Sequence, residues 1–173
     1  MADPVSPTGV GHSNQVEVIV DDQQTDVEID AHRWAALAAA VMHAEDERGE
    51  LTLTFVDRDE IAELNREHMG VDGPTDVLSF PLDALGEAIG GEPVLLGDVV
   101  VCPAVAAAAA PDHAGTLDDE LALLVVHGCL HVVGYDHAEP DQAAVMRARE
   151  MELLVAHHWG GPAPTVFRQE HSS

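Results

Sequence analysis

Short runs of β-branched and other apolar residues along the first part of the chain predict strands. Four such runs lie at residues 16–20, 51–56, 76–80 and 94–101. In the second run threonine alternates with apolar residues, which is typical of a strand with one buried face. A loop with several Gly and Pro residues, including Leu85, Ile89 and Gly91, separates the last two runs. The pattern therefore predicts a small sheet of four strands.

Apolar residues spaced three and four apart predict two helices among these strands. The first helix follows Asp30, a suitable N-cap, and its apolar positions begin at Trp34. The second helix begins at Asp57, which forms a pattern like a capping box with Glu60, and runs to about Glu67. The order of strand then helix is thus expected to occur twice.

The later part of the chain predicts three more helices. They lie at residues 103–110, 117–133 and 140–158. Thr116 can cap the long middle helix, and Gly134 is well placed to end it. Because most strands precede most helices, the fold class expected is α+β. It should contain a small mixed four-stranded sheet packed with about five helices, with the long helix in the C-terminal half.

Length and composition predict one domain with loose ends. The 173 residues are 46% hydrophobic and 23% charged, which is enough for a single core. Residues 1–14 and 160–173 hold Pro, Gly and Ser without periodicity, so they are expected to be flexible tails. The single domain, catalytic if the protein is an enzyme, should span residues 15–159. Two cysteines, the absence of a leader pattern and the lack of a long apolar run favour a cytoplasmic protein without a membrane role.

The charge balance restricts the partners that the chain can attract. It has 7 basic residues, all arginine, against 32 acidic ones, which gives a net charge of −25. Such a chain repels nucleic acid and anionic membranes at long range. An RNA partner would have to be held by a local arginine, by a metal ion or through a companion protein.

One segment, HGCLHVVGYDH at residues 127–137, carries the chemistry. His127 and His131 are four residues apart on the long predicted helix, so both imidazoles can reach one metal ion. Gly134 lets the chain turn back and deliver His137 to the same ion. Three neutral imidazoles leave a fourth position for water, as in a catalytic zinc site, where bound water ionises near pH 7.

Histidines can show this spacing by chance, because the chain has 11 of them. Random placement gives roughly 0.6 pairs at spacing four, but only about 0.04 triples with this third spacing. A metal site is therefore favoured over ordinary surface or core histidines. The other eight histidines, including His157 and His158, are expected to be solvated.

The spacing matches the zinc-peptidase pattern HExxHxxGxxH, but Gly128 stands where the glutamate base of those enzymes would be. HGCLHVVGYDH instead resembles the HGxLHLxGYDH signature of the YbeY family of metal-dependent endoribonucleases. PTDVLSFP at residues 74–81 and LGDVVVCP at residues 96–103 are similar to two further blocks of that family, and Leu64 and Asn65 precede the first of them at the expected distance. The resemblance covers roughly residues 50–158.

This resemblance implies an endoribonuclease that matures ribosomal RNA of the small subunit and acts in ribosome quality control. His127, His131 and His137 would hold one zinc ion that activates water or a 2′-hydroxyl. The implied partners are ribosomal RNA and the small subunit, reached through a ribosomal protein or an assembly GTPase, without DNA. Two alternatives stay open: a non-catalytic assembly factor with a structural metal, and a metal-dependent hydrolase of another substrate.

The general base and any cation at the phosphate are not identified by the motifs. Family members usually carry an arginine where this chain has Met69, so Arg66, one helical turn earlier, is a candidate replacement, although an ordinary surface arginine on a helix is the favoured interpretation. Asp136 could orient an imidazole, accept a proton, or only cap the loop. Thr75 and Ser79 could support a turn or a ligand.

Overall fold

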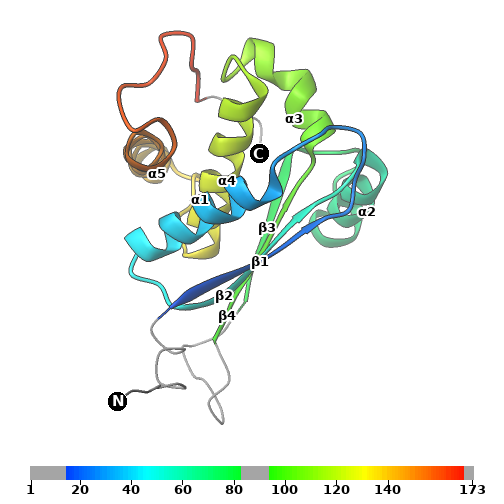
Figure 1. Ribbon diagram of the computed structural model, residues 1–173. Coiled ribbons are helices and arrows are strands. Elements are labelled where there is room, and N and C mark those ends of the chain that lie inside the picture. Colours follow the sequence, from blue (N-terminus) through cyan, green and yellow to red (C-terminus); the bar gives the residue numbers. More distant parts are fainter. Residues whose placement is uncertain (1–14, 83–93, 170–173) are drawn as a thin grey trace, which may run out of the picture.

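The computed structural model describes residues 15–82 and 94–169, and it has the predicted α+β fold (Figure 1). The strands are β1 (Val16–Asp22), β2 (Gly49–Phe55), β3 (Val77–Pro81) and β4 (Leu95–Val101). The helices are α1 (Ala31–Ala44), α2 (Arg58–Met69), α3 (Pro103–Ala109), α4 (Leu117–Val132) and α5 (Pro140–Leu154). The predicted N-terminal tail and the loop residues Leu85, Ile89 and Gly91 lie outside the described residues.

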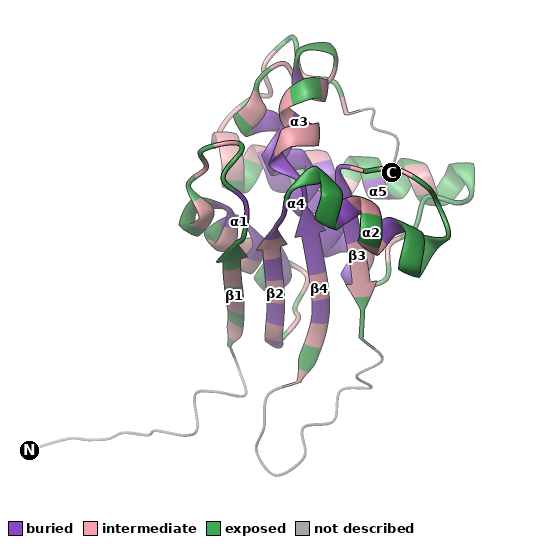
Figure 2. Cartoon of the chain, turned by 90° about the vertical axis from the view of Figure 1, so that its right-hand side faces the viewer, coloured by how far each residue is buried: buried purple, intermediate pink, exposed green. Residues whose placement is uncertain are grey.

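The sheet is mixed, as predicted, with strand order β1-β2-β4-β3. β1, β2 and β4 are parallel, and β3 pairs with β4 in the antiparallel direction at one edge. Helices α1, α4 and α5 lie on one face of the sheet and α2 on the other (Figures 1 and 2). Side chains of β4 alternate accordingly: Val99 and Val101 join the core under α4, whereas Val100 joins a smaller cluster with Ile61 of α2.

Helix α4 is the centre of the fold. Thr116 accepts a hydrogen bond from the backbone N–H of Asp119 at its start, as predicted. From Leu121 to Leu130 every residue is buried, so the helix has no solvent-facing stripe (Figure 2). Packing around the whole helix therefore fixes the positions of its two histidines, His127 and His131. No helix in the described ranges is long and apolar enough to cross a membrane.

The chain after α5 differs from the predicted helix and tail. A π-helical turn, Val155–Trp159, replaces the last turns of the predicted helix. Residues that follow it contact the domain: Phe167 packs edge-on against Trp159 with ring centroids 4.8 Å apart, and the Gln169 amide donates to the Arg147 carbonyl at 2.8 Å. The flexibility of the tails and the domain bounds drawn from it stay predictions.

The expectation that His158 is solvated is wrong. Its side chain is only 4% exposed, and its Nε2 lies 2.8 Å from a carboxylate oxygen of Asp119 in α4. The same oxygen accepts a hydrogen bond from the Trp159 indole at 3.0 Å. The π-helical turn places both rings against the same carboxylate. Histidine spacing alone could not predict this arrangement.

A second buried carboxylate makes stability depend on pH. Glu120 of α4 accepts the backbone N–H of Ala114 at 3.2 Å, and its other oxygen is 3.5 Å from His113 Nδ1. Burial raises the pKa of Glu120 above its ordinary value. Between the pKa of Glu120 in the unfolded chain and its raised pKa in the folded protein, only the folded state keeps the proton. The free energy of unfolding therefore falls as pH rises through this range.

We expect Glu120→Gln to raise the free energy of unfolding at pH 7 and to leave it unchanged at pH 4. The glutamine carbonyl can still accept from Ala114, and its amide can donate to His113, without a charge to bury. Urea denaturation at the two pH values measures the difference. An equal effect of the substitution at both pH values would contradict the explanation.

Candidate metal centre

Three histidines converge at the C-terminal end of α4, as their spacing predicts. His127 and His131 lie one turn apart on the helix, and their ring centroids are 4.5 Å apart. Gly134 has φ +111°, a conformation that side chains rarely adopt, and there the chain turns back to bring in His137. One ring nitrogen from each of the three histidines lies within 4.8 Å of the other two. By its donor set and spacing, the cluster could therefore hold a metal ion.

Hydrogen bonds fix which nitrogen of two rings faces the centre. His127 Nδ1 lies 2.6 Å from a Glu150 carboxylate oxygen, and His131 Nδ1 lies 2.9 Å from the Tyr135 carbonyl oxygen. Both partners are acceptors, so each Nδ1 carries the proton and each Nε2 presents its lone pair. This is the tautomer that a metal ligand needs, and it shows that the residues fit a metal ion.

Burial keeps these imidazoles neutral. It lowers the pKa of His127 to about 3, with further lowering from the neighbouring His131 and His137. The pKa of His131 is lowered as well, mainly by burial and then by His137. The short contact between His127 and Glu150 is therefore a hydrogen bond from a neutral ring to a carboxylate. Neutral imidazole is also the form that coordinates metal.

A second layer of contacts supports the turn after α4. The Tyr135 hydroxyl donates to Glu45 at 3.1 Å, and the Arg149 guanidinium binds the other oxygen of Glu45. Glu45 lies just after α1 and Arg149 lies on α5, so two helices hold the residue whose carbonyl orients His131. Arg149 therefore has a structural role, because its guanidinium holds Glu45 in place.

Sequence reasoning missed Glu150. It is 1% exposed on α5, between the buried positions Met146, Leu153 and Leu154. A carboxylate on the apolar face of an amphipathic helix is costly unless it has a partner, and that pattern was the available signal. The partner itself could not be inferred, since His127 is 23 residues away on another helix.

We expect Glu150→Ala to weaken zinc binding by about 10- to 100-fold, because His127 loses the acceptor that fixes its tautomer. Competition against a colorimetric zinc chelator measures this affinity. Glu152→Ala is the matched control, since that side chain is 68% exposed on the same helix. Equal zinc affinity in the two variants would show that Glu150 does not orient the ligand.

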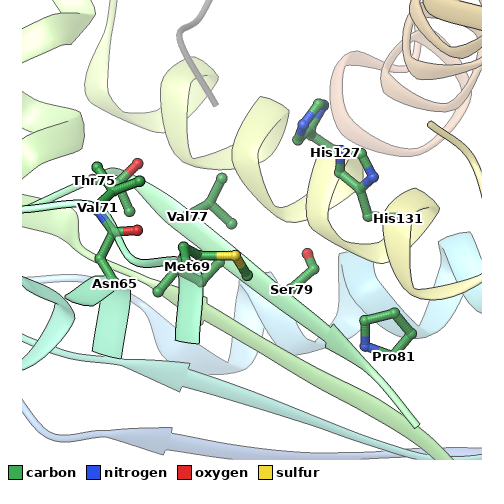
Figure 3. Close-up of a pocket in the computed structure, with 10 residues that line it drawn as sticks. Asn65, Met69, Val71, Thr75, Val77, Ser79, Pro81, His127 and His131 are labelled. Atoms are coloured by element: carbon green, nitrogen blue, oxygen red, sulfur yellow. The ribbon is translucent and has the colours of Figure 1, made fainter. Parts of the chain in front are cut away.

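A cavity of about 420 Å³ opens beside the histidines (Figure 3). It lies between the end of α2, strand β3 and α4, and His127 and His131 form one end of it. Ser79 of β3 lies in its middle and donates a hydrogen bond to the Gly128 carbonyl at 3.0 Å. The metal centre therefore adjoins a space that can receive a substrate.

Gly128 faces strands β3 and β4. A Cβ atom there would lie 2.7 Å from Val99 Cγ1, 3.2 Å from Ser79 Oγ and 3.3 Å from Val77 Cγ2. Real Cβ atoms essentially never come so close, so α4 can pack at this distance only with glycine. A glutamate here, as in the peptidase pattern, would require α4 or the sheet to shift.

The candidate catalytic residues, Asp136 and Arg66, differ in their distance from the histidines along the chain and in their contacts. Asp136 accepts the backbone N–H of His137 at 2.7 Å. Arg66 is exposed on α2 and does not line the cavity, whereas Met69 does. Arg33 pairs with Asp118 at the opposite end of α4 from the histidines, and it does not line the cavity.

Cys129 is fully buried, as predicted, and burial raises its pKa to about 12. It is an inert core thiol. Asp76 is 4% exposed, and its Coulombic effect raises the pKa of His127 slightly against the stronger effect of burial. The second sequence block thus places a negative charge near the site.

Comparison with known proteins agrees with this geometry. A family model described as Endoribonuclease YbeY matches residues 19–158, which include the three histidines. The Endoribonuclease YbeY of Salinispora tropica is 46% identical over 151 residues, covering 80% of this chain and 93% of its own. That of Thermobifida fusca is 43% identical over 137 residues, covering 76% of this chain and 88% of its own.

The fold also has a solved counterpart. The solution structure of TM1509 from Thermotoga maritima covers 86% of this chain and 98% of its own, with a TM-score of 0.52 and 24% identity. That likeness shows the fold alone. The family model spans the sheet, α4 and the histidine cluster, and the two relatives are 46% and 43% identical over most of this chain. The chain therefore belongs to the YbeY endoribonuclease family.

Proposed function

We propose that this protein is a zinc-dependent endoribonuclease of ribosomal RNA maturation. The observation that carries the proposal is a three-histidine site with one open side. His127 is buried and His131 half-buried, but His137 is exposed, and no fourth His, Cys, Asp or Glu joins the group among the described residues. Structural zinc sites are closed by four protein ligands, whereas catalytic ones keep a position for water or substrate.

The residues of the chain divide the work at this site. His127, His131 and His137 would hold zinc, which acts as a Lewis acid on a phosphodiester and lowers the pKa of a nucleophile. Glu150 and the Tyr135 carbonyl keep two of the rings in the coordinating tautomer. The adjoining cavity admits the RNA strand to the open side. Asp136, bound to the loop backbone, is a positioning residue in this scheme.

Delivery by another protein is part of the proposal. With a net charge of −25 and no lysine, the chain does not attract free RNA over long distances. A ribosomal protein or an assembly GTPase on the small subunit would bring the enzyme to its substrate in the cytoplasm. Ribosome quality control would use the same encounter on defective subunits. Arg66 stays our candidate for a local cation at the phosphate.

Metal removal and return test the proposal. Chelated protein should not cut precursor ribosomal RNA of the small subunit, and one equivalent of zinc should restore cleavage. Arg66→Ala in the same assay should cut more slowly if that arginine meets the phosphate. Protein that stays folded with zinc bound and cuts neither free precursor nor assembled subunits would favour a non-catalytic assembly factor. Cleavage of a peptide library in place of RNA would favour another hydrolase.

A further inference from the structure

The cavity beside the metal centre has mostly apolar walls. Met69, the last residue of α2, and Val71 lie on one side of it, and Val77 and Pro81 of β3 lie on the other (Figure 3). Met69 and Val71 are 47% and 52% exposed and line the same cavity. A ligand bound there would cover their apolar surface.

Polar groups gather at the end of the cavity opposite the histidines. Asn65 and Thr75 lie there near Met69 (Figure 3). The Asn65 amide donates to the Gly73 carbonyl at 2.9 Å, which fixes the carboxamide, and an amide has further donor and acceptor capacity. The Thr75 hydroxyl makes a long contact, 3.4 Å, to Asp76. A ligand that reaches this end can therefore form hydrogen bonds with its edge.

Cations are missing from the cavity lining. None of the described residues that line it is an arginine, and the whole chain has no lysine. The cavity is therefore poorly suited to hold a run of phosphates by charge. A flat ring with apolar faces and a polar edge fits both the walls and the distal end. An unstacked nucleobase has this shape and chemistry.

We infer that the cavity binds one unstacked base of the RNA strand and so positions the neighbouring phosphodiester at the histidines. Met69 lies against the face of the base, where a thioether contacts aromatic rings favourably. Asn65 and Thr75 meet its edge. The inference rests on the proposed function, and it adds that this enzyme grips RNA through a base and not through backbone charge.

Binding of small ligands to the zinc-loaded protein tests the base pocket directly. Calorimetry should show at least one of AMP, CMP, GMP and UMP binding roughly tenfold more tightly than ribose 5-phosphate, which has the same phosphate without a base. Equal affinities for ribose 5-phosphate and all four nucleotides would overturn the inference.

Salt dependence separates base binding from backbone binding. A single-stranded hexamer of 2′-O-methyl nucleotides, checked for integrity by electrophoresis, should lose about threefold or less in affinity between 50 and 200 mM salt. A strand held by all five of its phosphates would lose about a hundredfold over the same range. The larger loss would overturn the inference.

Matched variants place the base in this cavity. Met69→Ala and Val71→Ala should each reduce the preference for nucleotides over ribose 5-phosphate several-fold, whereas Val145→Ala, 60% exposed on α5, should not. Unchanged preference in both cavity variants would overturn the inference. Because these experiments measure binding, their failure is distinct from that of the proposed function: a protein that binds bases but cuts no RNA loses only the latter.

Discussion

His131→Ala is expected to abolish cleavage of precursor ribosomal RNA while the protein stays folded. The substitution removes one of three metal donors, and a metal ion contributes several kcal/mol to such reactions, so the rate should fall by roughly a thousandfold or more. His131 is half-buried and its Nδ1 forms a hydrogen bond with the Tyr135 carbonyl, so the loss of stability should stay near 1 kcal/mol. A gel assay of cleavage and circular dichroism measure the two effects.

His32→Ala is the matched control, because His32 is exposed on α1. It should cut like the unmodified protein, and this guards against a general effect of losing a histidine. If His131→Ala and His32→Ala cut equally well, the nuclease activity lies outside the histidine cluster or belongs to a contaminant. Zinc content measured on both proteins shows whether the His131 substitution has emptied the site.

Gly128→Glu is expected to destabilise the fold by more than about 3 kcal/mol. On an exposed helix any residue other than proline would favour helix formation over glycine, by up to about 1 kcal/mol. Here a Cβ would lie 2.7 Å from Val99 Cγ1, so α4 would have to move away from the sheet, and overpacking alone costs about 1–3 kcal/mol. The Cβ would also lie 3.2 Å from Ser79 Oγ and 3.3 Å from Val77 Cγ2, so the longer side chain would start from a crowded position.

Urea denaturation of purified protein measures this loss, and Gly128→Ala separates the effect of the Cβ from that of the longer side chain. Gly161→Glu is the control, because a Cβ at Gly161 meets no atom within 4 Å. Its free energy of unfolding should change by less than about 0.5 kcal/mol. A stable Gly128→Glu protein would mean that α4 can shift away from the sheet at low cost.

Local sequence patterns predicted the elements of the fold better than their arrangement. Alternation in β2 and the caps at Asp57 and Thr116 depend on neighbouring residues, and the structure confirms them. The placing of β4 between β2 and β3 depends on contacts between distant segments, which no local period encodes. The π-helical turn after α5 likewise depends on the carboxylate of Asp119 that its rings meet.

The same distinction holds at the site. Helical spacing and a turn-forming glycine were enough to predict that His127, His131 and His137 converge. Glu150 reaches His127 only because α5 packs on α4, and that packing is not visible in spacing. Arg33 and Arg149 form ion pairs with Asp118 and Glu45, and these pairings between distant segments are likewise not visible in local spacing.

Helix α4 has no solvent-facing stripe, and this restricts how the family can diverge. A typical surface helix tolerates substitution on its outer side, so its variable positions recur with a period of 3.6 residues. From Leu121 to Leu130 every position of α4 is buried against the sheet or another helix, and the same segment carries a ligand histidine. We therefore expect substitutions to be rare at every position of this segment. Those that occur should be accompanied by compensating substitutions in α1, β4 and α5.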